Sequence, residues 1–338
     1  MLLLPERLLD HNAHLGRGGP DGPSQHWHFY IRRFLRLIPP LLITLGIAYA
    51  LVAAGVLGGG TQVQGVASQL LYFANYYFIF IDQGNTTPDG TTILWSLSVE
   101  EHFYIVYPVL VTLLITLRRS RRAMLTLFVV ACTVALGWRY HLATADGFVD
   151  ARTYYATDTR FDSILFGCIL AIWRNPVAGP LALRTTPDRF MRHRSWLIGS
   201  RAESVRCAVG ASILLFTIVY RDAVFRESVR YTLQGLALMP LFHAAIRSPD
   251  RGAFRVLNLG VVARLGVISY AVYLSHDVIA HLLVRVGIFR TFEPLLLIAT
   301  LSIAVVYGLL LDRLVDPYFR RLRKSFRTMP VATREPRI

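Results

Sequence analysis

Two adjacent carboxylates, Glu100 and Glu101, stand at the start of an apolar run that continues to Leu117. A carboxylate within a bilayer-length helix costs roughly 2.5–3.5 kcal/mol on insertion scales, so such an acid indicates a functional site. Ser98, Glu101 and Tyr104 share one helical face because they are spaced at i, i+3 and i+6. Glu101 can therefore point inward, beside hydroxyl groups, and take part in proton transfer. The alternative is an interfacial carboxylate that caps the start of its helix.

Two other residues of the same segment have open interpretations. Trp95 is either a wall of an acceptor pocket or a member of the aromatic belt at the membrane interface. His102 could serve as a base, but it projects from a different helical face than Glu101.

A second candidate group follows the same helical logic further along the chain. Ser269, Tyr273 and His276 share a face because they are spaced by four and three residues. A histidine inside a membrane is either a hydrogen-bonded packing residue or a proton-transfer group, and both interpretations remain open here.

Charged residues mark two further candidate positions. Arg160 lies between Asp158 and Asp162, which could hold it in a structural ion pair or place all three in a polar site. Three arginines at the start of another apolar run lie within about one helical turn, where they could bind phosphate groups or extend to lipid headgroups. They are Arg32, Arg33 and Arg36.

Composition places these groups in a membrane. Of the 338 residues, 54% are hydrophobic and 17% are charged, and the mean hydropathy is +0.45. This leaves too little charge to cover a soluble surface. The net charge of +15 comes largely from short arginine clusters between apolar runs, which suit the cytoplasmic ends of spans better than a nucleic-acid patch. The three cysteines have no metal-ligand spacing, and we expect no metal.

The elements that would position these residues are membrane helices. Nine apolar runs come near the ~20 residues that a spanning helix needs. They cover about 38–58, 65–81, 93–117, 123–140, 158–173, 204–220, 229–246, 261–284 and 294–315. All basic clusters lie on the cytoplasmic side only if the run 65–81 does not cross. We therefore expect an all-α polytopic bundle of eight crossings with one re-entrant or interfacial segment.

This expectation fixes the chain's organisation and location. Both termini would be cytoplasmic and the protein would be integral to the inner or plasma membrane. The sequence divides into a polar, Gly- and Pro-rich segment over 1–30, a membrane domain over 31–319 and a basic tail over 320–338.

Four ordered segments resemble the signatures of the acyltransferase-3 family of integral membrane O-acyltransferases. They are Phe29-Tyr-Ile-Arg-Arg-Phe-Leu-Arg-Leu-Ile-Pro39, Trp95-Ser-Leu-Ser-Val-Glu-Glu-His-Phe-Tyr104, Asp158-Thr-Arg-Phe-Asp-Ser-Ile-Leu-Phe-Gly167 and Leu265-Gly-Val-Ile-Ser-Tyr-Ala-Val-Tyr-Leu-Ser-His276. The segment Val315-Asp-Pro-Tyr-Phe319 is similar to the family's usual ending.

The resemblance implies transfer of an acyl group, commonly acetyl from acetyl-CoA, to a hydroxyl of a carbohydrate, an exported glycan or a glycolipid. It also implies that acyl-CoA is a co-substrate, bound through its phosphates at Arg32, Arg33 and Arg36. The catalytic candidates are Glu101 and His276. The cavity would be lined by the remaining candidates, Trp95, Ser98, Tyr104, Arg160, Asp162, Ser269 and Tyr273.

The chain departs from the family pattern at its beginning. Family members usually open with a helix that carries an arginine and a histidine thought to be the catalytic base, and this sequence contains no such helix. We therefore expect an N-terminally incomplete version whose activity is in doubt. Two alternatives follow: a non-catalytic membrane homologue, or a transporter of a lipid-linked sugar, although no internal repeat supports a transporter.

Overall fold

The structure is a computed structural model that describes residues 22–82, 84–145, 147, 149–173, 200–250, 252–287 and 293–325. Within these ranges the chain is helical, apart from connecting segments and one isolated antiparallel β-bridge between Gly59 and Pro88. This confirms the all-α fold class expected from the sequence. The expectations for residues 1–21, for the loop 174–199 and for the tail beyond 325 concern positions outside the described residues.

Among the residues that the structure describes, six helices contain a stretch long and apolar enough to cross a membrane. They are α2 (Gly22–Ala53), α5 (Leu94–Thr116), α6 (Arg121–Thr144), α10 (Ser200–Val219), α13 (Gly260–Arg285) and α14 (Glu293–Leu314). The other two runs expected to cross form α8 (Thr157–Trp173) and α12 (Val229–Arg247), which are not among these six.

The run 65–81 is broken into two short helices, α3 (Val63–Leu70) and α4 (Ala74–Phe80). Tyr72 lies between them with φ 59°, a left-handed conformation that interrupts the helical path. The helices have 8 and 7 residues. At about 1.5 Å per residue each is roughly 10–12 Å long, against a hydrocarbon core of about 30 Å. Neither can cross by itself, which supports the expectation that this run is not a span.

The described residues belong to two compact units, and each is described by itself. The first contains Ala67–Gln83 and Leu94–Ala263, and the second contains Gly84–Ile93, Arg264–Ile338 and the part of His14–Val66 that is described.

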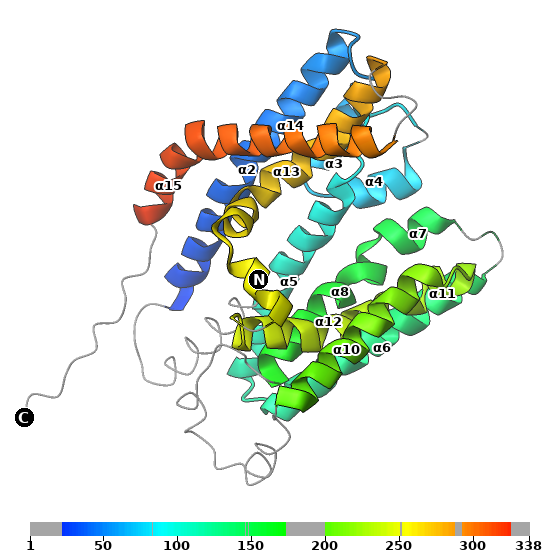
Figure 1. The fold of residues 1–338 in the computed structure, drawn as a ribbon, viewed down its shortest axis with the longest axis vertical. Coiled ribbons are helices and arrows are strands. Elements are labelled where there is room, and N and C mark those ends of the chain that lie inside the picture. The colour runs from blue at the N-terminus through cyan, green and yellow to red at the C-terminus, as the bar shows by residue number, and fades with distance from the viewer. Residues whose placement is uncertain are drawn as a thin grey trace, which may run out of the picture. The chain divides into compact units, whose positions relative to one another are not determined.

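The first unit is a bundle in which α6, α8, α10 and α12 run side by side (Figure 1). Its core is formed by buried side chains of α5, α6 and α8, among them Phe103, Phe128 and Phe166. The start of α6 is fixed by Ser120, whose hydroxyl accepts a hydrogen bond from the Ala123 amide at 3.2 Å. Gly235 of α12 lies against the Phe166 ring, where a β-carbon would clash, so glycine permits this close packing.

Two short helices complete the outer parts of this bundle. They are α7 (Asp150–Tyr155) and α11 (Ala223–Glu227). A 3₁₀ helix, Gly252–Asn258, precedes α13.

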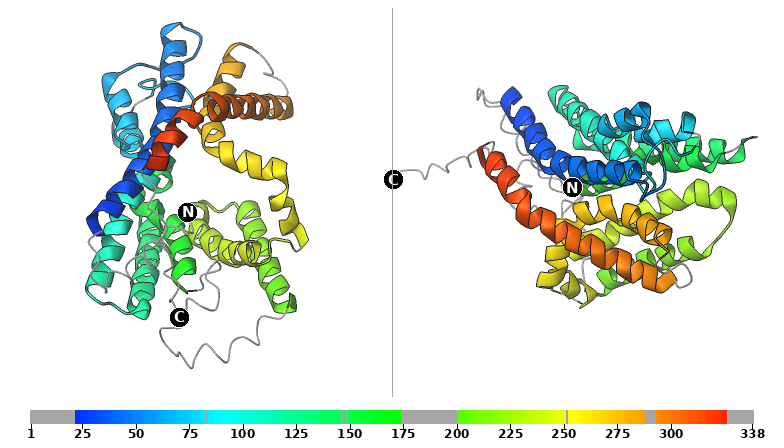
Figure 2. Two further views of the ribbon diagram at one scale, coloured as in Figure 1. Left: turned by 90° about the vertical axis from the view of Figure 1, so that its left-hand side faces the viewer. Right: turned by 90° about the horizontal axis from the view of Figure 1, so that it is seen from above.

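The second unit is built around α2, α13 and α14. A hydroxyl pair, Thr44 with Tyr307 at 2.7 Å, joins α2 to α14. The segment Gly84–Ile93 packs against α13: Gly90 has φ 79°, and a β-carbon there would meet the backbone of Asp277. The last helix, α15 (Asp316–Ser325), contacts α2, as Figure 2 shows with α15 in red and α2 in blue.

Candidate functional site

The first turns of α5 carry the carboxylate pair. Glu101 is half-buried and Glu100 is exposed, so the two adjacent acids have different surroundings. Ser98 is buried, and its hydroxyl donates to the Leu94 carbonyl at 3.2 Å. Tyr104, one turn beyond Glu101, is also buried. The structure therefore places Glu101 between two buried hydroxyl-bearing residues on successive turns of one helix.

His102 of α5 contacts the start of α8. Its Nδ1 lies 2.7 Å from the Thr157 hydroxyl, and its ring packs against the Tyr76 ring at a centroid distance of 6.2 Å. The Asn75 side-chain amide also donates to the Thr157 hydroxyl, at 2.9 Å. Thr157 therefore ties α4 and α5 to the N-terminus of α8.

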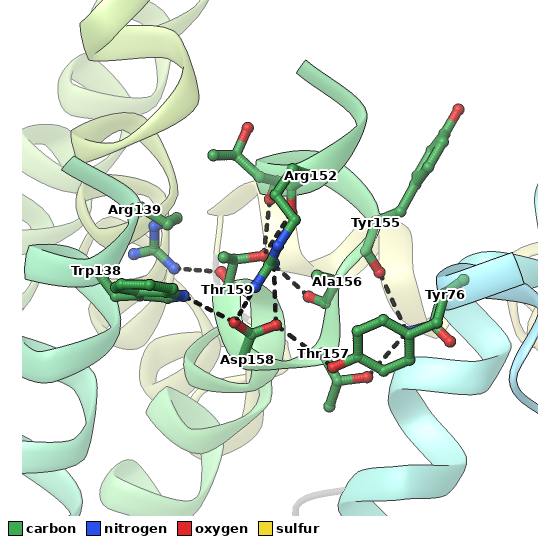
Figure 3. A network of polar contacts seen from close by, with 11 residues as sticks. Tyr76, Trp138, Arg139, Arg152, Tyr155, Ala156, Thr157, Asp158 and Thr159 are labelled. Carbon is green, nitrogen blue, oxygen red and sulfur yellow. Dashed lines mark hydrogen bonds and ion pairs between the residues drawn. The ribbon is translucent and has the colours of Figure 1, made fainter. Parts of the chain in front are cut away.

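Asp158 is held by donors from three elements (Figure 3). Arg152 of α7 donates from both terminal nitrogens to the two carboxylate oxygens, at 3.0 and 2.5 Å. The indole nitrogen of Trp138 on α6 donates at 2.7 Å, and the Tyr76 hydroxyl of α4 lies at 3.4 Å. Asp158 thus joins the end of α6 to the α7–α8 corner.

Asp162 is fully buried and pairs with Arg139 of α6, whose side chain is also fully buried. The guanidinium donates to both carboxylate oxygens, at 2.8 and 2.7 Å. It also donates to the Ser228 and Thr159 carbonyls and to the Thr232 hydroxyl. These five contacts match the five N–H donors of a guanidinium, so none is left over.

Arg160 has a different environment from the acids on either side of it. Its guanidinium carbon lies 4.0 Å from the ring centroid of Tyr231, 5.3 Å from that of Tyr154 and 5.4 Å from that of Trp95. Its Nη1 atom is buried and has no hydrogen-bond partner among the described residues. Three aromatic faces therefore enclose the charge without using that donor.

These contacts correct one expectation from the sequence. The spacing suggested that Arg160 could be held as an ion pair between Asp158 and Asp162. Instead Asp158 pairs with Arg152 and Asp162 pairs with Arg139. Arg160 is two residues from each acid, so it points to a different side of α8 and is directed away from both carboxylates.

In the second unit, α13 carries the other candidates. The Tyr273 hydroxyl donates to the Ile93 carbonyl at 2.8 Å, and His276 Nδ1 lies 2.7 Å from the Tyr273 carbonyl. A carbonyl oxygen can only accept, so this contact assigns the proton to Nδ1 and leaves Nε2 of the neutral ring as an acceptor. Ser269 is exposed and donates to the Gly266 carbonyl of its own helix at 3.0 Å.

The three arginines expected to bind phosphate groups, Arg32, Arg33 and Arg36, lie on α2 in the second unit. Arg36 is exposed, and Arg32 and Arg33 are half-buried. Arg32 and Arg36 share a face because they are four residues apart. Of the predicted residues, the structure brings Trp95 and Arg160 into contact within the first unit and Tyr273 and His276 into contact within the second.

Four residues of this region were not predicted from the sequence as site residues: Arg139, Arg152, Tyr154 and Tyr231. Arg139 offered a usable signal, because a single arginine near the end of an apolar run needs a buried partner. The two tyrosines offered none, since aromatic residues are common at the ends of membrane helices.

Comparison with known proteins gives a consistent result. Residues 22–311 match the model of the acyltransferase domain family, Acyl_transf_3. A Staphylococcus aureus (strain COL) protein named "Putative O-acetyltransferase" is 27% identical over 305 residues, which cover 87% of this chain and 47% of that protein. The O-acetyltransferase OatA of Staphylococcus aureus (strain NCTC 8325 / PS 47) is 34% identical over 257 residues, which cover 73% of this chain and 40% of OatA.

The chain thus spans about half the length of the curated relatives that it matches. No solved structure matches it significantly. The family model covers most of the chain, including the helices that carry Glu101, Arg160 and His276. The chain therefore belongs to the acyltransferase-3 family of membrane proteins.

Proposed function

We propose that the chain is a membrane O-acyltransferase that moves an acyl group, most simply acetyl, from acyl-CoA to a hydroxyl of a carbohydrate, such as an exported glycan or a glycolipid. The observation that carries the proposal is family membership across residues 22–311. The likeness to proteins named O-acetyltransferases supports the acyl group and the oxygen acceptor.

In the second unit, the proposed base is His276. His276 Nε2, left as an acceptor by the Nδ1 contact, takes the proton from the acceptor hydroxyl. The hydroxyl oxygen then attacks the thioester carbonyl, and the tetrahedral intermediate collapses by releasing the coenzyme A thiolate, which is protonated. In the first unit, Glu101 is a half-buried carboxylate that can take up a proton or balance a positive charge during the transfer. Arg160 supplies positive charge in the first unit, where Trp95, Ser98, Tyr104 and Asp162 are the other candidates. In the second unit, Ser269 and Tyr273 accompany His276 on α13.

The donor would bind at α2. Three cations within about one turn suit the phosphates of coenzyme A, because a guanidinium forms charge-assisted hydrogen bonds with phosphate oxygens. Arg32, Arg33 and Arg36 would meet acyl-CoA at the cytoplasmic end of α2, with both termini of the chain on that side.

A matched pair of variants tests the proposal. The full chain is reconstituted in liposomes and supplied with radiolabelled acetyl-CoA and a panel of neutral and acidic sugars. Glu101→Gln should lower kcat by about 10²–10⁴, because glutamine keeps the volume but can neither take a proton nor balance a positive charge. Glu100→Gln makes the same change at the neighbouring exposed position and should leave transfer within about twofold.

Two results would contradict the proposal. Equal activity of the two variants would remove Glu101 from the chemistry. Failure of the chain to transfer an acyl group to any sugar, while still binding one, would favour the alternative of a non-catalytic homologue or a transporter of a lipid-linked sugar.

A further inference from the structure

Two buried arginines of the first unit differ in how their hydrogen-bond donors are used. Arg139 donates to Asp162, Thr159, Thr232 and Ser228, so all of its N–H donors have partners within the protein. Arg160 is held by ring faces instead, and its buried Nη1 has no partner among the described residues. A cation–π contact fixes the charge and the plane of a guanidinium without using its N–H donors. Arg160 is therefore positioned to bind a group that the described residues do not supply.

A second arginine beside the same ring shows the same pattern. Arg230 donates from Nη2 to the Tyr231 hydroxyl at 2.9 Å, and its guanidinium carbon lies 4.9 Å from the ring centroid. Its Nε atom is buried without a partner among the described residues. Two independent arginines next to Tyr231 thus each carry an unsatisfied buried donor, which proteins generally avoid unless a ligand or water satisfies it.

The charge around Tyr231 indicates the sign of that ligand. Three guanidinium groups surround the ring, because Arg139 also lies 5.6 Å from its centroid. Two carboxylates contact this group: Asp162, which is bound by Arg139, and Glu227, which accepts from the hydroxyls of Thr153 and Tyr231 at 2.9 and 3.5 Å. Cations therefore outnumber carboxylates, and in a largely buried place this excess attracts an anion strongly.

We propose that Arg160 and Arg230, arranged around Tyr231, form a subsite for an anionic group, a carboxylate or a phosphate, on the acyl acceptor. The planar guanidinium of Arg160 matches the geometry of either group. Trp95 and Tyr154, which flank Arg160, add aromatic surface that can lie against a sugar ring. The inference rests on the proposed function, because it takes the bound molecule to be the acyl acceptor. The binding itself can be measured without any acyl transfer.

The experiment compares three sugars of similar size: glucuronate, glucose 6-phosphate and glucose. Each is titrated onto the full chain in detergent at low salt, with binding followed by ligand-observed NMR. The wild type should bind one or both of the anionic sugars at least about tenfold more tightly than glucose, as charge-assisted hydrogen bonds predict. Glucuronate alone would identify a carboxylate subsite, and glucose 6-phosphate alone would identify a phosphate subsite.

The variants separate this subsite from general positive charge. Arg160→Gln should abolish the preference for an anion, and Arg230→Gln should reduce it. Arg206→Gln is the matched control, because Arg206 is exposed on α10 and donates to the Ala202 carbonyl of its own helix. It makes the same change in charge and should keep the preference. If Arg160→Gln does not fold, Arg160→Lys replaces it, since lysine keeps the charge but loses the planar fork and should retain only part of the preference.

Two outcomes would overturn the inference. One is equal binding of all three sugars by the wild type. The other is an Arg160→Gln protein that melts at a lower temperature yet keeps its preference, which would make Arg160 a structural residue. Acyl transfer without discrimination between charged and neutral sugars would leave the proposed function standing and remove only the subsite.

Discussion

At the scale of single residues, the pair of Arg139 and Asp162 determines how α6, α8 and α12 fit together. Both side chains are fully buried, and their hydrogen bonds reach α8, α12 and the residue before α12. Removing one member would leave a buried charge without its partner, which typically costs 3–5 kcal/mol. Replacing both by apolar residues of similar volume avoids that cost.

Arg139→Met should therefore lower the free energy of unfolding by about 3–5 kcal/mol, measured by denaturation in detergent. The double variant Arg139→Met with Asp162→Leu should recover most of this loss. Arg122→Met serves as the control, since Arg122 is exposed on the same helix. A double variant as unstable as the single one would show that the hydrogen bonds to Ser228 and Thr232, rather than the buried charge, hold the three helices.

The same residues show what the sequence could and could not predict. Helical spacing predicted that Glu101 and Glu100 would have different surroundings, and the structure places one half-buried and the other exposed. Spacing along one helix could not identify the partners of Asp162 and Arg160, because these come from α5, α6, α7 and α12. Which side chains meet across helices depends on how the helices are rotated and packed, and local periodicity does not contain that information.

At the scale of elements, the run 65–81 shows what the pattern of apolar runs and basic clusters can predict and what it cannot. The requirement that all basic clusters lie on the cytoplasmic side predicted that this run would not cross the membrane. The structure adds the break at Tyr72, whose left-handed backbone no apolar pattern predicts. The spans of α5, α6, α10, α13 and α14 were found within a few residues, because about 20 consecutive apolar residues are a strong signal. The first span was placed too late: the run 38–58 was expected, but the span of α2 covers Tyr30–Ala53.

The helix α15 depends on one carboxylate. Asp316 lies in its first turn and accepts from Arg320 and Arg323, and Arg320 also reaches Asp312 of α14 at 3.3 Å. Burial alone would raise the pKa of Asp316, but the hydrogen bonds from the two arginines outweigh it and hold the pKa below its usual value. The ionised form is therefore the one that the folded helix prefers.

It follows that α15 should loosen only in acid. Because the pKa of Asp316 is lowered in the folded state, its contribution to stability is complete above the usual aspartate value of about 3.9 and is lost as pH falls through the lowered pKa. A spin label on Ser325→Cys in a cysteine-free background should keep constant mobility from pH 7 to about pH 4 and become mobile below it. Asp316→Asn should make the label mobile at every pH. A transition between pH 6 and 7 would instead implicate a histidine.

At the scale of the whole molecule, the topology depends on whether α8 and α12 cross the membrane. Counting only the six long apolar helices would place the loop 174–199 outside and residues 221–222 inside. Counting α8 and α12 as well reverses both positions and puts every basic cluster in the cytoplasm. The arginines between 174 and 203 number six, so the rule that positive loops stay inside favours eight crossings.

Cysteine labelling in intact cells decides between the two topologies. In a background without the three native cysteines, single cysteines are introduced by Thr61→Cys, Ala223→Cys and Ser195→Cys. With eight crossings, a membrane-impermeant maleimide should label positions 61 and 223 from outside and position 195 only after the cells are permeabilised. Thr61→Cys is the internal control, because residue 61 follows α2 and is outside in both topologies. Labelling at 195 with none at 223 would leave six crossings, and α8, which carries Arg160, would then not span the bilayer.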